Sequence, residues 1–387
     1  PPYYATIARM IAEEKPPALR SYLTWMLAHA AAPHLGRAFV EEAFRLDQLL
    51  TGVKQVSPRW RRCVQRADEA LGELLGQAFV AARFAGESKA RAVELTRVVL
   101  AAMDAELEHL PWMDAPTRAA ARHKLAKMAY LVGYPDRWRA YDVAVSRADY
   151  AGNVRRATQF ELARQLAKIG QPVDRFDWEM TPPTVNAYYE PTLNELALPA
   201  GQLQPPFFSA AFHPAVNFGS AGGGTIGHEM THGFDDEGRQ FDADGNLRDW
   251  WTKQTAEQFE RATQCVVDQF ARYEAVPGIK LNGKLTAGEN IADIGGVKLG
   301  FQAYQAWKVK QAPAPPARVE RFTDEQLYFL AYGQSWCSKE TPEFLETRAR
   351  VDPHAPARWR VNGVVVDQPG FAEAYRCAPP ANACAVW

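Results

Sequence analysis

The sequence predicts a mainly helical α+β protein of two lobes, and three observations support this prediction. The chain has 387 residues, which at about 150 residues per domain suggests two or three domains. Apolar residues recur at spacings of three and four over the first 130 residues, the period of an amphipathic helix. Near residue 136 the pattern changes to short strand-like runs before helical patterns return. We therefore expect a helical lobe over residues 1–136, and over residues 137–387 a lobe that combines helices with a small sheet.

Breaks rich in Pro and Gly divide the first lobe into segments of ordinary helix length. They fall at Pro16–Pro17, Pro33, Gly52–Pro58, Gly86 and Pro111. Two of the segments carry clear apolar stripes, which are typical of helix-packing faces. The stripes are Leu19, Tyr22, Leu23, Met26 and Leu27, and then Val93, Leu95, Val98, Val99, Ala102 and Met103.

The second lobe begins with a further helix, expected over Arg147–Ile169. Two short strands, Thr184–Tyr189 and Glu195–Leu198, flank a turn at Pro191–Asn194. Helical patterns return after Gly224, and a short polyproline-like surface loop is expected at 311–316.

Charge and composition exclude several classes of function. Lys and Arg number 44 and Asp and Glu 45, so no basic surface indicates nucleic acid or an anionic membrane as a partner. No apolar run reaches the 18 residues that a membrane-spanning helix needs, and no signal-peptide pattern opens the chain. The five cysteines are an odd number, so at least one thiol is free or pairs outside this chain.

The segment Gly227–Asp236 contains the pattern His-Glu-x-x-His at His228, Glu229 and His232. On a helix, residues four apart share a face, so both imidazoles can reach one metal ion. Glu229 lies beside them, where it can deprotonate a metal-bound water. The alternative is a surface helix with two unrelated histidines. The preceding glycines and Asp235, which can accept the second imidazole proton of a ligand, favour a metal site.

A third ligand is expected from Glu289, which lies four residues before Asp293. On one helix face, Glu289 can bind the metal while Asp293 supports a ligand histidine. Two histidines and one carboxylate leave a fourth position open for water, the arrangement of a catalytic zinc site with a single ion. Alone, Glu-x-x-x-Asp is a weak signal, but it gains weight beside the first motif.

These residues resemble the neprilysin and endothelin-converting-enzyme family of zinc endopeptidases. The family patterns stand here at 185–189, 227–236 and 288–293, and shorter matches extend from Trp60 to Trp387. The resemblance implies a thermolysin-like zinc lobe and a helical cap lobe that encloses a central cavity. It also implies a zinc-dependent endopeptidase acting on short peptides, with Glu229 as the general base.

The resemblance further implies roles for residues that bind substrate. His354 stands in the family's Asp-x-His-x-Pro-x-x-x-Arg pattern and would stabilise the oxyanion. Arg360 would hydrogen-bond a substrate carbonyl, with Arg358 the less favoured choice. Asn186 and Ala187 would pair with substrate backbone as an added edge strand.

Two positions depart from the family pattern in the expected pocket for the residue after the cut. Gln202 stands where an aliphatic residue is usual, and Thr225 where an apolar residue is common. Phe207 and Trp336 are expected to remain as apolar walls. We therefore expect this pocket to be roomier or more polar than the strictly hydrophobic pocket of relatives.

The resemblance also assigns the five cysteines. It implies a Cys265–Cys384 disulfide and partners for Cys63, Cys337 and Cys377 in an amino-terminal segment or a companion chain. Disulfides indicate an exported protein, in the periplasm, the cell envelope or outside the cell, and the Ala- and Arg-rich composition favours a bacterial source. Two alternatives stay open: a peptide-binding relative without catalysis, and a carboxy-terminal fragment of a nicked or two-chain peptidase.

Overall fold

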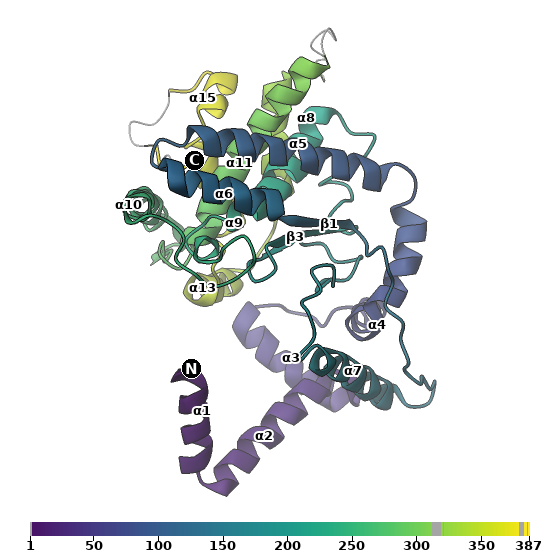
Figure 1. Cartoon of the computed structure of the whole chain (residues 1–387). Helices are drawn as coiled ribbons and strands as arrows, with labels where there is room; N and C mark the ends of the chain where they lie inside the picture. Colours follow the sequence, from purple (N-terminus) through teal and green to yellow (C-terminus); the bar gives the residue numbers. More distant parts are fainter. Residues whose placement is uncertain (1, 312–318, 320, 379–382, 385) are drawn as a thin grey trace. The chain divides into compact units, whose positions relative to one another are not determined.

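The computed structural model describes residues 2–311, 319, 321–378, 383–384 and 386–387 (Figure 1). All but the first residue of the expected polyproline-like loop at 311–316 lies outside these ranges. Among the described helices, none is long and apolar enough to cross a membrane.

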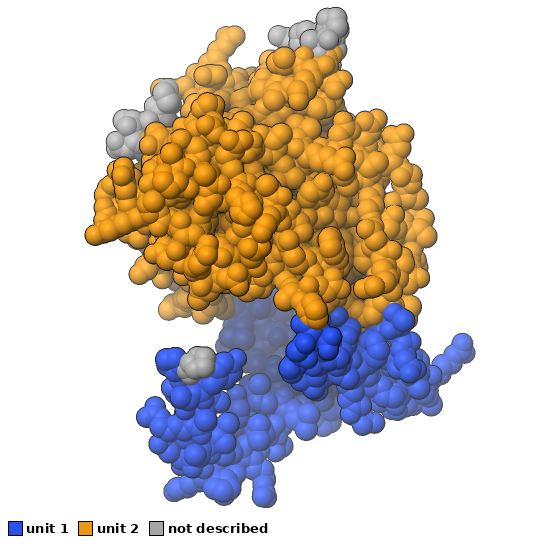
Figure 2. Space-filling view, in the orientation of Figure 1, with its two compact units in different colours: residues 1–62, 140–171 blue, residues 63–139, 172–387 orange. Residues whose placement is uncertain are grey.

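The chain forms two compact units, coloured separately in Figure 2. Unit 1 contains residues 1–62 and 140–171, and unit 2 contains residues 63–139 and 172–387. The units differ from the expected lobes, because residues 63–136 group with the carboxy-terminal part of the chain. The cause is packing: helix α5 (Ser88–His109) lies against helix α11 (Ala287–Lys310).

Unit 1 is a set of helices with little buried surface. It contains α1 (Pro2–Glu13), α2 (Pro16–Ala31), the 3₁₀ helix η1 (Ala32–His34), α3 (Arg37–Thr51) and α7 (Tyr150–Ala167). None of the described residues of α1, α2 or α3 is buried. The stripe on α2 that was expected to pack is exposed except for the half-buried Leu19, with Leu27 at 72%. The equivalent stripe on α5, in unit 2, is packed into the core as expected.

Unit 2 holds the main apolar core and is also chiefly helical. Its longer helices are most of α4 (Arg59–Arg83), α5, α6 (Ala115–Lys127), α10 (Lys253–Phe270), α11 and α12 (Asp324–Ser335). Its shorter helices are α8 (Pro214–Asn217), α9 (His228–His232), η3 (Gly238–Gln240), α13 (Pro342–Val351), α14 (Ala357–Val365) and α15 (Pro369–Tyr375).

A three-stranded sheet lies beside the helices of unit 2, in the order β1 (Ala129–Gly133), β3 (Glu195–Pro199), β2 (Tyr188–Glu190). Strand β3 is central, parallel to β1 and antiparallel to β2. The sequence predicted β2 and β3 but not β1, and β2 is shorter than the predicted strand. A small hairpin, β4 (Glu274–Val276) and β5 (Ile279–Lys280), is separate from this sheet.

The centre of unit 2 is a close crossing of two helical segments. The π-helix η2 (Phe218–Gly227) runs directly into α9, and both pack against α11 (Figure 1). A Cβ atom on Gly296 would lie 2.5 Å from the backbone nitrogen of His228, and one on Gly227 would lie 2.8 Å from the carbonyl of Gly296. Since real Cβ atoms do not approach so closely, only glycine permits this crossing. The crossing brings α9 against the first turns of α11.

Candidate active site

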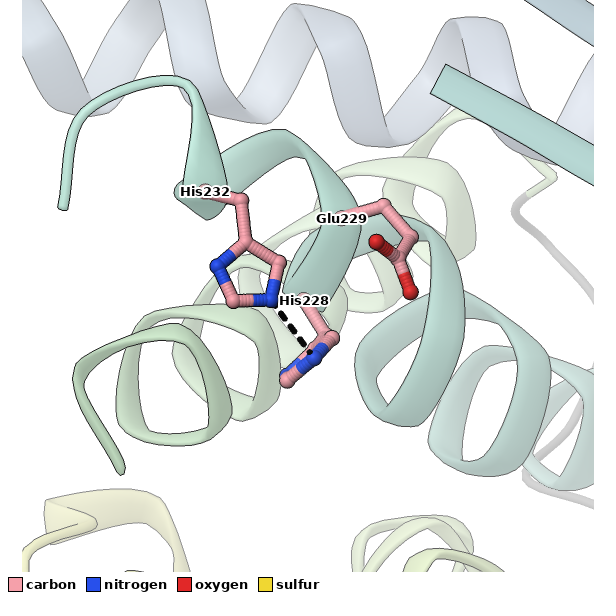
Figure 3. A group of neighbouring side chains, drawn as sticks. All are labelled: His228, Glu229 and His232. Atoms are coloured by element: carbon pink, nitrogen blue, oxygen red, sulfur yellow. Dashed lines mark hydrogen bonds between the residues drawn. The ribbon is translucent and has the colours of Figure 1, made fainter. Parts of the chain in front are cut away.

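The two histidines of α9 face each other. The Nε2 atoms of His228 and His232 lie 3.0 Å apart, and Figure 3 shows the rings turned toward one another with Glu229 beside them. The pair arises because the four-residue spacing puts both rings on one side of the short helix.

Each histidine has a carboxylate on its other ring nitrogen. Nδ1 of His228 lies 2.9 Å from Asp293 Oδ1, and Nδ1 of His232 lies 2.6 Å from Asp235 Oδ2. A proton shared with a carboxylate at Nδ1 leaves the Nε2 lone pair available, which is the arrangement of metal-ligating histidines. The sequence placed Asp235 and Asp293 in this role, and the structure brings both to these positions.

Glu289, in the first turn of α11, lies beside the two histidines and is the third candidate ligand. Its Oε2 lies 3.4 Å from His228 Nε2, and its Oε1 lies 3.6 Å from His232 Nε2. Oε2 is buried and has no hydrogen-bond partner within the described residues, although Arg360 Nη2 lies 3.3 Å away. Burial opposes ionisation of Glu289, but His228 and the neighbouring cations outweigh it and hold its pKa well below its usual range. Two nitrogens and an orphaned carboxylate oxygen fit one zinc ion.

Glu229 is buried beside this set and lines the same cavity. Burial raises the pKa of its carboxyl group, and the neighbouring His228 and His232 oppose that rise. A raised pKa makes the carboxylate a stronger proton acceptor, as a general base requires. Glu229 also lies within a compact group with His228 and His232, but the positions of the Glu289 oxygens make Glu289 the better third ligand.

Arg360 on α14 is buried and paired with Asp293 by two hydrogen bonds, Nε to Oδ2 and Nη2 to Oδ1, each 2.7 Å. Its guanidinium carbon lies 3.9 Å from the ring centroid of Trp336, a cation–π contact. Burial opposes its charge, but Asp293 and Glu289 raise its pKa overall. Arg360 and Trp336 both line the cavity.

His354 reaches the site from the loop between α13 and α14. Its Nε2 lies 3.2 Å from Glu289 Oε1, and its Nδ1 lies 2.7 Å from Asp352 Oδ1. Arg348 Nε donates to Asp352 Oδ2 at 2.8 Å. This chain of contacts fixes the imidazole so that Nε2 faces the cavity.

The cavity of about 400 Å³ collects most of the residues predicted from the sequence. Asn186 and Ala187 line it just before the edge strand β2. Gln202 and Thr225 also line it, and Gln202 Nε2 donates to Thr225 Oγ1 at 3.0 Å. The expectation for Phe207 is corrected: Phe207 is not among the lining residues. Its backbone carbonyl accepts a hydrogen bond from Ser220, which fixes it in a turn outside the cavity.

No role was predicted from the sequence for two residues, Asp352, which contacts His354, and Lys124, which contacts the segment after α9. Asp352 is the first residue of the Asp-x-His-x-Pro-x-x-x-Arg pattern, but no role was predicted for it. Its spacing of two residues from His354 could have indicated a contact with that imidazole. Lys124 on α6 was missed entirely, because nothing in its neighbours marks a buried lysine.

The comparisons with known proteins agree with this geometry. Two sequence models of peptidase family M13 match the chain, over residues 1–135 and 186–384. The chain belongs to peptidase family M13. The resemblance to the neprilysin and endothelin-converting-enzyme family is therefore confirmed.

Curated M13 relatives are similar over nearly the whole chain. An endothelin-converting enzyme homolog of Locusta migratoria is 38% identical over 95% of this chain and 52% of the relative. Human endothelin-converting enzyme 1 is 38% identical over 95% of this chain and 50% of the relative. The chain thus spans about half the length of the curated relatives it matches.

Solved M13 structures confirm the mainly helical fold. The zinc metalloprotease Zmp1 of Mycobacterium tuberculosis, in complex with an inhibitor, matches with a TM-score of 0.90 and 38% identity, over 97% of this chain and 57% of that chain. PepO of Lactobacillus rhamnosis matches with a TM-score of 0.80 and 30% identity, over 92% of this chain and 55% of that chain.

The cysteines of this M13 chain fall into two groups. Cys265 and Cys384 form a disulfide with a Cα–Cα distance of 5.6 Å, which confirms the predicted pair. Cys63, Cys337 and Cys377 are exposed and have no disulfide partner among the described residues.

Proposed function

We propose that this protein is a zinc-dependent endopeptidase that hydrolyses peptide bonds of short peptides. One observation carries the proposal. The Nε2 atoms of His228 and His232 and the carboxylate of Glu289 converge within 3.0–3.6 Å, at a cavity that Glu229 also lines. Membership of a family of metallopeptidases supports the same reaction.

The three converging side chains would hold the zinc ion. Bound there, zinc supplies Lewis acidity and lowers the pKa of a coordinated water. The Glu229 carboxylate accepts a proton from the attacking water and later delivers it to the leaving amine.

The remaining residues hold the substrate and the developing charge. When both of its ring nitrogens carry a proton, His354 donates its Nε2–H to the oxyanion of the tetrahedral intermediate. Arg360, fixed by Asp293, donates to a substrate carbonyl. Asn186 and Ala187 pair with substrate backbone, since they precede β2 at the edge of the sheet.

The pocket that receives the residue after the cut is polar on one side. Gln202 and Thr225 line the cavity as a hydrogen-bonded pair. We infer a preference for residues whose side chains can hydrogen-bond, because an apolar side chain would leave the amide and hydroxyl groups without new partners.

Zinc content and peptide cleavage, measured together, test the proposed reaction. Glu229→Gln is expected to keep one zinc per chain and lose cleavage of a fluorogenic peptide by three decades or more. His228→Ala is expected to lose both. The control is His123→Ala, an exposed histidine on α6, which leaves both unchanged. Cleavage by zinc-loaded Glu229→Gln at the wild-type rate would contradict the mechanism.

A second proposal concerns the context of the chain. We infer that Cys63, Cys337 and Cys377 pair with cysteines of a further amino-terminal segment or companion chain, and that the protein is exported. The exposure of all three thiols and the Cys265–Cys384 disulfide support this. Non-reducing mass analysis of native material tests it, and three alkylatable thiols in that material would contradict the pairing. If zinc binds but cleavage requires an added segment, the two-chain alternative is correct.

A further inference from the structure

Lys124, on α6, is fully buried beside the segment that follows α9, the helix that carries His228 and His232. Its relative exposure is 0%. Its Nζ donates to three backbone carbonyls, those of Gly233 at 2.7 Å, Gly238 at 2.8 Å and Phe241 at 2.8 Å. An ammonium group has three N–H donors, and each is matched by one acceptor. Lysine is almost never fully buried unless its charge is compensated. The burial of Lys124 therefore indicates a specific role for its side chain.

The three carbonyls belong to one segment, residues 233–241, which follows directly after α9. Gly233 is the residue after His232, and Phe241 ends the segment beyond the short helix η3. Lys124, on a different element, therefore binds both ends and the middle of the segment. The rings of Phe234, Tyr189 and Trp250 surround the ammonium group at 5.5–5.9 Å and add cation–π stabilisation.

The backbone of Gly238 connects Lys124 to Asp235, the residue that contacts His232. Its carbonyl accepts from Lys124, and its N–H donates to Asp235 Oδ1 at 2.7 Å. Glu237 N–H donates to the same oxygen at 3.0 Å. The other oxygen, Asp235 Oδ2, lies 2.6 Å from His232 Nδ1. Two sets of hydrogen bonds, joined by the backbone of Gly238, thus connect Lys124 through Asp235 to His232.

We propose that Lys124 is a positioning residue for the zinc ligand His232. By holding the segment 233–241, it fixes the peptide groups that orient Asp235, and Asp235 in turn fixes the tautomer and direction of the His232 ring. The inference rests on the proposed zinc site. It differs from a purely structural role because it predicts a change in metal affinity and not only in stability.

Zinc affinity, measured by competition with a chromophoric chelator, tests this proposal. Lys124→Met keeps an unbranched side chain, one heavy atom shorter, and removes its N–H donors. It is expected to weaken zinc binding by about 10–100-fold, the usual cost of losing a residue that supports a ligand. The control is Lys127→Met, one turn along α6, where the exposed lysine pairs with Asp244 at 2.7 Å. Its zinc affinity is expected to stay within twofold of the wild type.

A double-mutant cycle with Asp235→Ala distinguishes the two roles. If Lys124 acts through Asp235, adding Lys124→Met to Asp235→Ala causes little further loss of zinc affinity. Fully additive losses would overturn the proposal. The visible absorption spectrum of the Co²⁺-loaded protein gives a second readout, and Lys124→Met is expected to change it while Lys127→Met does not.

Other outcomes are also decisive. Lys124→Met with wild-type zinc affinity and an unchanged Co²⁺ spectrum, but a lower unfolding temperature, would make the lysine purely structural. If Lys124→Met does not fold, Lys124→Gln retains two N–H donors and is expected to lose part of the affinity. Wild-type affinity in Lys124→Gln would overturn the proposal. A wild-type protein that binds no zinc would contradict the proposed function itself.

Discussion

Arg360 and Asp293 form a buried, two-pronged ion pair, with Nε–Oδ2 and Nη2–Oδ1 distances of 2.7 Å each. The same Asp293 carboxylate contacts His228 Nδ1 at 2.9 Å. One carboxylate therefore links the residue proposed to hold substrate with a proposed metal ligand.

The first prediction concerns this pair. Arg360→Ala leaves the buried Asp293 without its main partner, so the free energy of unfolding is expected to fall by about 3–5 kcal/mol. Chemical denaturation measures it. The control is Arg358→Ala, two residues away, whose guanidinium lies 4.3 Å from the Trp359 ring centroid and outside the cavity. Equal losses from both substitutions would contradict a special role for the buried pair.

The second prediction concerns His354. Loss of one oxyanion donor is expected to reduce kcat by one to three decades in His354→Ala, with zinc content unchanged. Asp352→Asn is expected to give a smaller reduction in kcat, because it weakens the contact that orients the His354 ring but leaves the ring in place. Steady-state kinetics with His109→Ala, an exposed histidine on α5, as control checks both. An unchanged kcat in His354→Ala would remove His354 from the mechanism.

The third prediction concerns specificity. Thr225→Val and Gln202→Leu each remove one member of the hydrogen-bonded pair in the cavity. Each is expected to shift kcat/KM by about tenfold toward peptides with Leu rather than Asn after the cut. Thr225→Ser, which keeps the hydroxyl group, should retain the wild-type preference. A wild-type enzyme that already prefers Phe or Leu there would contradict the polar pocket.

The fourth prediction concerns Glu195, at the start of β3. It is fully buried, and neither carboxyl oxygen has a hydrogen-bond partner within the described part of the chain. Burial raises its pKa to about 8, with Arg175 opposing and the acidic Glu179, Glu190 and Asp177 adding to the rise.

The sign of the pH dependence follows from the proton count. Between pH 4.5 and 8, the folded protein keeps a proton on Glu195 that the unfolded chain releases. This contribution to stability is therefore present below pH 4.5 and is lost as the pH rises toward 8. The variant Glu195→Gln has no ionisable group here and lacks this pH dependence. The free energy of unfolding of the variant minus that of the wild type should therefore rise by roughly 2–4 kcal/mol from pH 4.5 to 8. Denaturation at both pH values checks this, with the exposed Glu257→Gln as control. An equal pH dependence in Glu195→Gln and the wild type would refute it.

Local patterns made most of the helices and the zinc motif predictable. His228, Glu229 and His232 lie within one helical turn, so their spacing alone indicated a shared face. Glu289 is distant in sequence from these residues, so its prediction as a ligand depended on a second motif and on the family resemblance. The Cys265–Cys384 disulfide was predicted from the family resemblance alone.

Features that depend on tertiary packing were not predictable in this way. Strand β1 is a short apolar run directly after a helix, and periodicity does not separate a buried parallel strand from a helix end. Lys124 and Glu195 look like ordinary surface charges, because only the folded chain places carbonyls or apolar walls around them. The apolar stripe of α2 predicted a packed face, yet no described element covers it.

The glycine crossing of η2 and α11 has a consequence for mutational surveys of this protein. Gly227 and Gly296 carry no chemistry, yet a single added methyl group at either would push apart the two helices that present His228 and Glu289. Intolerance at these two positions would therefore report on the geometry of the proposed metal site, although neither residue has a side chain that could bind the ion. A scan that ranks positions by their functional groups would overlook them.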